Sequence, residues 1–220
     1  MSREFYTNYM EKQEIRTFGR RHGKKLSARQ SHLIASVLPR IAPKNNENGE
    51  KIILEIGFGA GEHLRALAET NPTAVIIGAE PFMNGVASLM SAITDEQDEI
   101  RNEYKNIRVW PDDVRDFLRA TEIKFSEIWI LHPDPWPKAR HEKRRLLNTE
   151  FLETLGKKLN SDGRIIIGTD HWEYFDWIKD AASKTALCVS EPALATIQTR
   201  YQIKNKAETS APKYLILTNR

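Results

Sequence analysis

Along most of the chain after Gly49, short apolar runs rich in β-branched residues alternate with longer stretches of helical periodicity. The runs predict strands at 52–56, 75–77, 107–110, 128–131 and 164–167. The stretches after them predict helices at 62–69, 82–93 and 114–119, a helix reaching Leu159, and a helix at 172–182. Five successive strand–helix units are typical of an α/β fold, in which a parallel sheet is covered by helices on both faces.

The C-terminal part of the chain has a different pattern. Apolar runs at 186–189 and 214–217 are separated by a polar stretch without a helical period. We therefore expect the last two strands to form an antiparallel pair at one edge of the sheet.

The N-terminal part of the chain is basic. Residues 15–46 contain eight lysines and arginines and no acidic residue, which predicts a positively charged surface. Few large apolar residues precede Leu26, so we expect an extended or partly disordered arm, followed by a helix over 33–41 and a loop at 43–49. The predicted organisation is a basic arm with a first helix at 1–48 and a catalytic domain at 49–220.

Composition narrows the class of protein. Of the 220 residues, 29% are charged and 40% are hydrophobic, and the net charge is +3, which excludes wholesale disorder. The longest apolar runs are of strand length, so neither a membrane span nor a signal peptide is expected. The single Cys188 lies between two apolar residues and is interpreted as small and buried, and a cytoplasmic protein is predicted. The six histidines show no metal-ligand spacing, so no metal is expected.

A glycine turn joins the first strand to the first helix. Its glycines are Gly57, Gly59 and Gly61, at a point where the backbone must turn sharply and approach a ligand. A dinucleotide fingerprint would have a glycine at position 62, where this chain has Glu62. The turn is therefore interpreted as a site for a cofactor other than NAD.

Acidic residues surround this turn and end the next two strands. Glu55 and Glu62 flank the glycines, Glu80 ends the second strand, and Asp112 and Asp113 follow the third. A pyrophosphate would meet like charge here, whereas S-adenosylmethionine carries an amino cation and a sulfonium and has no phosphate. Glu80 is placed to accept hydrogen bonds from ribose hydroxyls, and either aspartate to accept one from the adenine amino group. The alternative interpretation is that these acids cap helices and solubilise loops.

The fourth strand leads into a segment with three prolines, His132-Pro-Asp-Pro-Trp-Pro137. The prolines fix the backbone at the carboxyl end of a strand, the usual ligand side of an open sheet, and present Asp134 and Trp136 there. A basic run follows, formed by Lys138, Arg140, Lys143, Arg144 and Arg145. The basic run, together with the basic arm, favours a folded RNA over a small substrate, although such a run is also typical of a solvated helix start.

On these motifs the sequence resembles the bacterial tRNA (guanine-N7)-methyltransferases. The marks are the 54–61 glycine turn, the 133–145 segment, Thr169-Asp170 and the 199–204 segment. The resemblance implies a Rossmann-like sheet of seven strands, mostly parallel with one antiparallel strand, and methylation of a guanine at position 46 in the tRNA variable loop. It implies that the cofactor is held by Glu55, Glu80, Asp113 and Asp134, with Asp112 competing for the role of Asp113. It implies that the substrate is met by Lys138, Asp170, Thr199, Gln202 and the stretch 140–145.

Guanine N7 has a free lone pair, so its methylation requires positioning rather than a strong base. We expect Asp134 to be the catalytic residue, stabilising the positive charge formed on the base, and Trp136 or Tyr201 to stack on the nucleotide. Gln202 and Lys204 depart from the closing motif of the family, which leaves open a weakened RNA-binding module with the methyltransferase fold. Methylation of an exocyclic amino group is a third hypothesis. The sequence leaves open whether the protein is a monomer or a homodimer.

Overall fold

The computed structural model describes residue 19, residues 21–192 and residues 211–220. The chain divides into two compact units, which meet between Ile123 and Lys124. Thr199, Tyr201 and Gln202, which were predicted to meet the substrate, lie outside the described residues.

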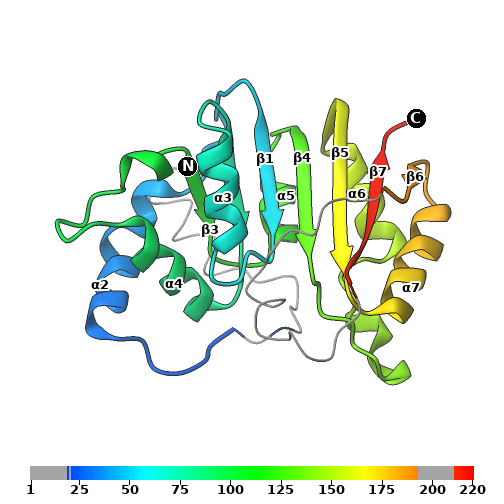
Figure 1. Ribbon diagram of the computed structural model, residues 1–220, viewed down its shortest axis with the longest axis horizontal. Helices are drawn as coiled ribbons and strands as arrows, with labels where there is room; N and C mark the ends of the chain where they lie inside the picture. Colours follow the sequence, from blue (N-terminus) through cyan, green and yellow to red (C-terminus); the bar gives the residue numbers. More distant parts are fainter. Residues whose placement is uncertain (1–18, 20, 193–210) are drawn as a thin grey trace. The chain divides into compact units, whose positions relative to one another are not determined.

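The first unit is an α/β arrangement around a three-stranded parallel sheet (Figure 1). Its helices are α2 (Ala28–Ser36), the 3-10 helix η1 (Leu38–Ile41), α3 (Glu62–Thr70), α4 (Met83–Ile93), the 3-10 helix η2 (Asn102–Tyr104) and α5 (Val114–Ala120). Its strands are β1 (Ile52–Ile56), β2 (Val75–Ala79) and β3 (Ile107–Trp110), in the order β3-β2-β1. Nearly every residue of these strands is buried, as expected for parallel strands covered on both faces.

Helices cover opposite faces of this sheet. A Cβ at Gly78 of β2 would lie 2.7 Å from Leu64, so this face is covered by α3. Gly78 is in register with Val109, so the next residue, Trp110, points to the other face. There its ring packs at 5.5 Å on Phe117 of α5. The two-sided covering predicted from the strand–helix pattern is thus present in this unit.

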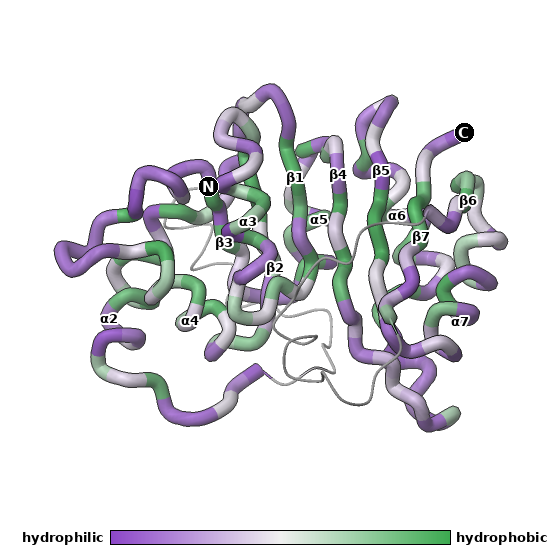
Figure 2. The backbone as a smooth tube through the Cα atoms, viewed as in Figure 1, coloured by the Kyte–Doolittle hydropathy of each residue, from purple (hydrophilic) through white to green (hydrophobic). Residues whose placement is uncertain are grey.

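The second unit contains the antiparallel strand. Its elements are β4 (Phe125–Leu131), the 3-10 helix η3 (Ala139–Arg144), α6 (Thr149–Lys157), β5 (Leu159–Thr169), α7 (Trp172–Ser183), β6 (Cys188–Ser190) and β7 (Lys213–Thr218). β4 and β5 are parallel, whereas β7 pairs antiparallel with both β5 and β6. In Figure 2 the middle of β5 is strongly hydrophobic, whereas the segment just after its first residue is hydrophilic.

The α/β fold class predicted from the sequence is confirmed: the described chain has seven strands, mostly parallel, with β7 antiparallel to its neighbours. Three details differ from the prediction. The single helix expected over 33–41 is instead α2, which begins at Ala28 and ends at Ser36, followed by the 3-10 helix η1. The helix expected to reach Leu159 ends at Lys157, and Leu159 instead opens β5, where it pairs with Phe125 of β4. Cys188, interpreted as buried, is exposed, because all three residues of the short strand β6 are exposed.

A close approach between α4 and the turn after β1 gives the first testable prediction. A Cβ at Gly85 would lie 2.3 Å from the carbonyl oxygen of Gly59. Alanine in a helix normally stabilises relative to glycine, by about 1 kcal/mol. Here the clash is with backbone and cannot be relieved by a rotamer, so Gly85→Ala should destabilise by about 1 to 3 kcal/mol in urea unfolding. Unchanged or increased stability would show that the turn has room to move.

Candidate functional site

The glycine turn after β1 has an open, left-handed backbone. Gly57, Gly59 and Gly61 have φ angles of 77°, 59° and 85°, a region that L side chains rarely adopt. A Cβ at Gly57 or Gly59 would meet nothing within 4 Å, whereas one at Gly61 would strike Leu89 of α4. Gly61 therefore serves packing, and the first two glycines leave backbone exposed to a ligand.

The side chain of Glu80 is hydrogen-bonded to this turn. It follows β2 and is buried, and its Oε2 accepts a hydrogen bond of 2.8 Å from the amide of Gly59. Its Oε1 accepts one of the same length from the amide of Phe82 at the start of α4. The carboxylate is thus held in a single orientation beside the open glycines.

Glu55 is a buried carboxylate at the end of β1. Its Oε1 lies 3.3 Å from Nδ1 of His63, and its side chain is 4% exposed. Within the described residues, Oε2 of Glu55 is buried with no hydrogen-bond partner. A buried carboxylate oxygen without a donor is costly. The site therefore fits a ligand that brings a cationic or N–H donor, such as the amino group of S-adenosylmethionine.

The two aspartates after β3 have different partners. Asp113 caps α5, accepting from the amide of Arg115 at 2.9 Å, and pairs with the Arg115 guanidinium at 2.6 Å. Asp112 accepts from the amide of Asp113 and from Nη2 of Arg21, the latter at 2.5 Å. Both carboxylates are buried. The helix-capping role weighed for Asp113 is therefore present, and both residues stay candidates for the adenine contact.

Part of the basic arm is hydrogen-bonded to the beginning of α4. The amide of Met83 donates to the carbonyl of Arg21 at 2.9 Å. Asn84 accepts from the amide of Gly23 and donates to the carbonyl of Lys24, at 2.7 and 2.6 Å. Residues 21–24 thus form neither helix nor strand, in agreement with the extended alternative of the prediction, and they pack on the first turn of α4. The charge pattern alone contained no signal for the contact between Arg21 and Asp112.

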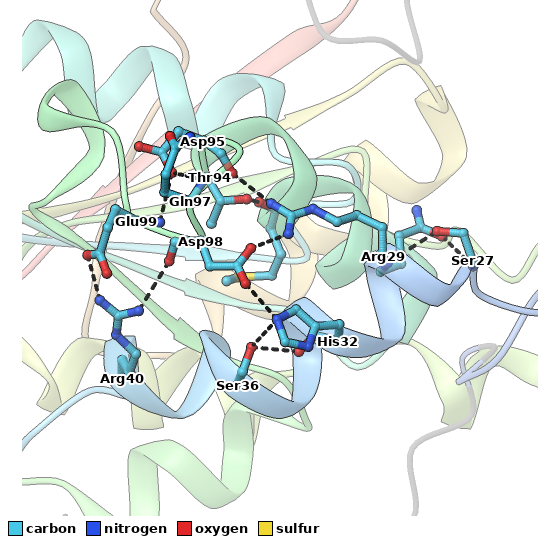
Figure 3. Close-up of polar contacts among 12 residues, drawn as sticks. Ser27, Arg29, His32, Ser36, Arg40, Thr94, Asp95, Gln97, Asp98 and Glu99 are labelled. Atoms are coloured by element: carbon cyan, nitrogen blue, oxygen red, sulfur yellow. Dashed lines mark hydrogen bonds and ion pairs between the residues drawn. The ribbon is translucent and has the colours of Figure 1, made fainter.

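Other basic residues of the N-terminal part are neutralised by acids (Figure 3). Arg29 and His32 of α2 both bind the carboxylate of Asp98, and Arg40 binds Glu99 at 2.7 Å. The hydrogen bond from His32, together with Arg29, holds the pKa of Asp98 below its usual value. These ion pairs tie α2 and η1 to the 94–100 loop, so Arg29 and Arg40 are less available to RNA than the charge pattern indicates.

In the second unit, a strained loop follows β4. His132 and Trp136 have φ angles of 50° and 42°, a conformation that is costly for residues other than glycine and that clusters at functional sites. Nδ1 of His132 lies 3.5 Å from Oδ1 of Asp170, which follows β5. Asp134 is exposed between the prolines. The two predicted site residues Asp134 and Asp170 therefore lie at the carboxyl ends of two paired parallel strands.

The side chain of Arg145 supports the loop that follows β4. Its side chain is 5% exposed, and its Nε donates to the carbonyl of Pro135 at 2.9 Å. Its guanidinium also lies over the rings of Tyr174 and Trp177 in α7, at 5.5 and 4.6 Å. Arg145, predicted to meet the substrate, is therefore buried as a support of the loop, where its charge is received by the aromatic rings, the Pro135 carbonyl and the carboxylate of Glu142 at 3.6 Å.

The rest of the basic run faces outward. Lys138, Arg140 and Lys143 are exposed, and Arg144 lies over the ring of Trp136 at 5.0 Å. Partial desolvation and then the charges of Arg144, Arg140 and Lys138 lower the pKa of His141 below its usual value. The cations of η3 are thus close enough to one another to act on the same neighbouring group.

Two kinds of feature are absent from the described part of the chain. None of its helices is long and apolar enough to cross a membrane. It likewise contains no group of histidine, cysteine and acidic side chains arranged to hold a metal ion.

The fold is shared with solved methyltransferases. The 16S rRNA methyltransferase KamB matches with a TM-score of 0.56 at 11% identity, covering 90% of this chain and 96% of that one. Human methyltransferase-like protein 13, solved with SAH, matches with a TM-score of 0.50 at 14% identity, covering 89% and 83%. The fold is therefore the Rossmann-like fold of the methyltransferase class.

Sequence comparisons narrow this class to one family. A family model described as "Putative methyltransferase" matches residues 49–212. The tRNA (guanine-N(7)-)-methyltransferase of Paramagnetospirillum magneticum is 39% identical over 176 residues, covering 74% of this chain and 72% of the relative. That of Jannaschia sp. is 33% identical over 232 residues, covering 92% and 94%. The chain belongs to the tRNA (guanine-N7)-methyltransferase family, which confirms the resemblance and the enzyme class predicted from the sequence.

The support that Arg145 gives to the loop leads to the second prediction. Arg145→Ala leaves the carbonyl of Pro135 without its donor and empties the aromatic pocket, so unfolding in urea should show a loss of about 2 to 4 kcal/mol. Arg140→Ala, an exposed position in the same run, is the matched control and should change stability by less than about 0.5 kcal/mol. Equal stability of the two variants would contradict the supporting role.

Proposed function

We propose that this protein transfers a methyl group from S-adenosylmethionine to N7 of a guanine in tRNA, at position 46 of the variable loop. The observation that carries the cofactor assignment is the open glycine turn beside Glu80 and the unpartnered buried oxygen of Glu55. The substrate assignment is supported by the family and by the exposed basic residues of η3. A tRNA substrate implies a cytoplasmic enzyme.

Three carboxylates of the first unit would hold the cofactor, which supplies a methyl group activated by its sulfonium. Glu80 accepts hydrogen bonds from the ribose hydroxyls, and Glu55 binds the amino cation. Asp112 or Asp113 accepts from the adenine amino group. Gly57 and Gly59 leave the backbone open to the ligand, so a side chain at either position would fill its space.

Asp134 is the proposed catalytic residue. Attack by the lone pair of N7 on the methyl group needs no prior removal of a proton and leaves the guanine ring positively charged. A fixed carboxylate near that ring stabilises the charge as it forms. The prolines on both sides of Asp134 and the hydrogen bond from Arg145 to Pro135 restrict the loop before the substrate arrives.

The RNA backbone is bound by cations of the second unit. Lys138, Arg140 and Lys143 are exposed and each can neutralise a phosphate. Arg144 is shared between Trp136 and the RNA, while Asp170, Thr199 and Gln202 contact the nucleotide. Arg145 is left out of this set because it is buried.

The direct test is mass spectrometry of tRNA digested after incubation with the protein and S-adenosylmethionine. We expect 7-methylguanosine, and sequencing of the fragments should place it in the variable loop. Methylation of an exocyclic amino group would give a different nucleoside. Binding of tRNA and cofactor without any product would favour the weakened RNA-binding module.

A third prediction concerns the cofactor. Glu80→Gln keeps the shape of the side chain but removes its charge and one acceptor oxygen, so S-adenosylmethionine should bind about 1 to 3 kcal/mol more weakly. Isothermal titration calorimetry measures this. Glu122→Gln, an exposed position in the same unit, is the control and should bind normally. Equal affinities would remove Glu80 from the site.

A fourth prediction separates charge from geometry at Asp134. Asp134→Asn should lower the single-turnover rate at saturating S-adenosylmethionine by about 100-fold or more, because the developing positive charge loses its counter-charge. Asp162→Asn, an exposed aspartate of β5, should react at the wild-type rate. A normal rate in Asp134→Asn would reduce Asp134 to a residue that shapes the loop.

A further inference from the structure

Trp172 is a large aromatic residue that the packing of the second unit does not use. It is 64% exposed, whereas Tyr174, Phe175 and Ile178 of the same helix are buried. Burying an indole is strongly favourable. An indole left in water at the first residue of a helix is therefore available to a ligand rather than to the core.

Its place in the unit is the ligand side of the strands. Trp172 opens α7 two residues after Asp170, and β5 is paired in parallel with β4, Leu131 being in register with Gly168. Figure 1 shows the beginning of α7 and the segment after β4 at the same end of these strands. The exposed ring thus belongs to the same rim as Asp170 and the basic residues of η3.

The other aromatic residue described on this rim already has partners. The ring of Trp136 is covered by Arg144 at 5.0 Å and meets the edge of His141 at 5.7 Å. Tyr201, the second stacking candidate predicted from the sequence, lies outside the described residues. Among the described aromatic residues of this rim, Trp172 therefore has the ring most open to solvent.

The charges beside Trp172 indicate which part of an RNA it meets. Glu173 and Asp176 are exposed on the same helix, and Asp170 precedes it. These acids repel phosphates but tolerate bases, whose edges carry N–H donors. Stacking of unstacked bases on exposed aromatic rings is the usual way in which proteins bind single-stranded RNA regions.

We propose that Trp172 is a stacking platform for a base of the tRNA that is unstacked when the substrate docks, while η3 binds the backbone. This inference rests on the proposed tRNA substrate and adds a residue that positions it. The two residues contribute differently to the affinity for tRNA. The contribution of Trp172 is independent of salt concentration, whereas that of Lys138 falls as the salt concentration rises.

The test compares the tRNA affinity of four variants over a range of salt concentrations. Trp172→Ala should bind tRNA about 5- to 100-fold more weakly, and Trp172→Phe, which retains a ring, should recover most of the loss. The slope of log affinity against log salt should be unchanged in both. Lys138→Ala should reduce that slope by about one, and Glu173→Ala, the exposed neighbour, should bind at least as well as the wild type.

A duplex RNA without loops is the second ligand, because its bases are stacked and unavailable. Wild type and Trp172→Ala should bind it equally. Equal tRNA affinity of wild type and Trp172→Ala, or an equal loss on duplex RNA, would overturn the proposal. So would self-association of the wild type in sedimentation that Trp172→Ala abolishes, because a second copy would then cover the ring. Failure of the wild type to bind tRNA at all would instead contradict the proposed function.

Discussion

The first unit depends on one close backbone contact. The carbonyl of Gly59 fits against α4 only because residue 85 has no side chain, and the amide of the same glycine is held by Glu80. The left-handed turn is thus fixed from two sides, which keeps its outer side open. The ligand-binding geometry is therefore a consequence of how β2 and α4 pack around β1, and not of the glycines alone.

In the second unit, the loop after β4 is held in place by the cationic side chain of Arg145. Proline residues cannot donate backbone hydrogen bonds, so a loop containing three of them needs other support. The guanidinium of Arg145 provides it by bonding the Pro135 carbonyl and packing on two aromatic rings of α7. Burial raises the pKa of Tyr174 in this pocket to about 12, and Asp134 adds to the rise, whereas the hydrogen bond from the Leu147 amide and the charge of Arg145 act in the opposite direction.

The charge pattern of the N-terminal part did not predict the ion pairs that its arginines form. A stretch without acids predicted a free basic surface, yet Arg21, Arg29 and Arg40 bind carboxylates that lie 59 to 91 residues away in the chain. Such pairing is invisible in a local pattern because its partners come from other elements. The same limit explains Cys188, whose apolar neighbours suggested burial although β6 is an exposed strand.

The sequence by itself determined the strand–helix order, the glycine turn and the acids at the strand ends, because periodicity and backbone preference are local properties. It also determined the family, through motifs that span both units. Only the tertiary structure decided which members of the basic run face solvent, separating exposed Lys138 from buried Arg145. The same holds for Trp136 and Trp172. The members of each pair differ in burial because burial depends on what the rest of the chain brings to them.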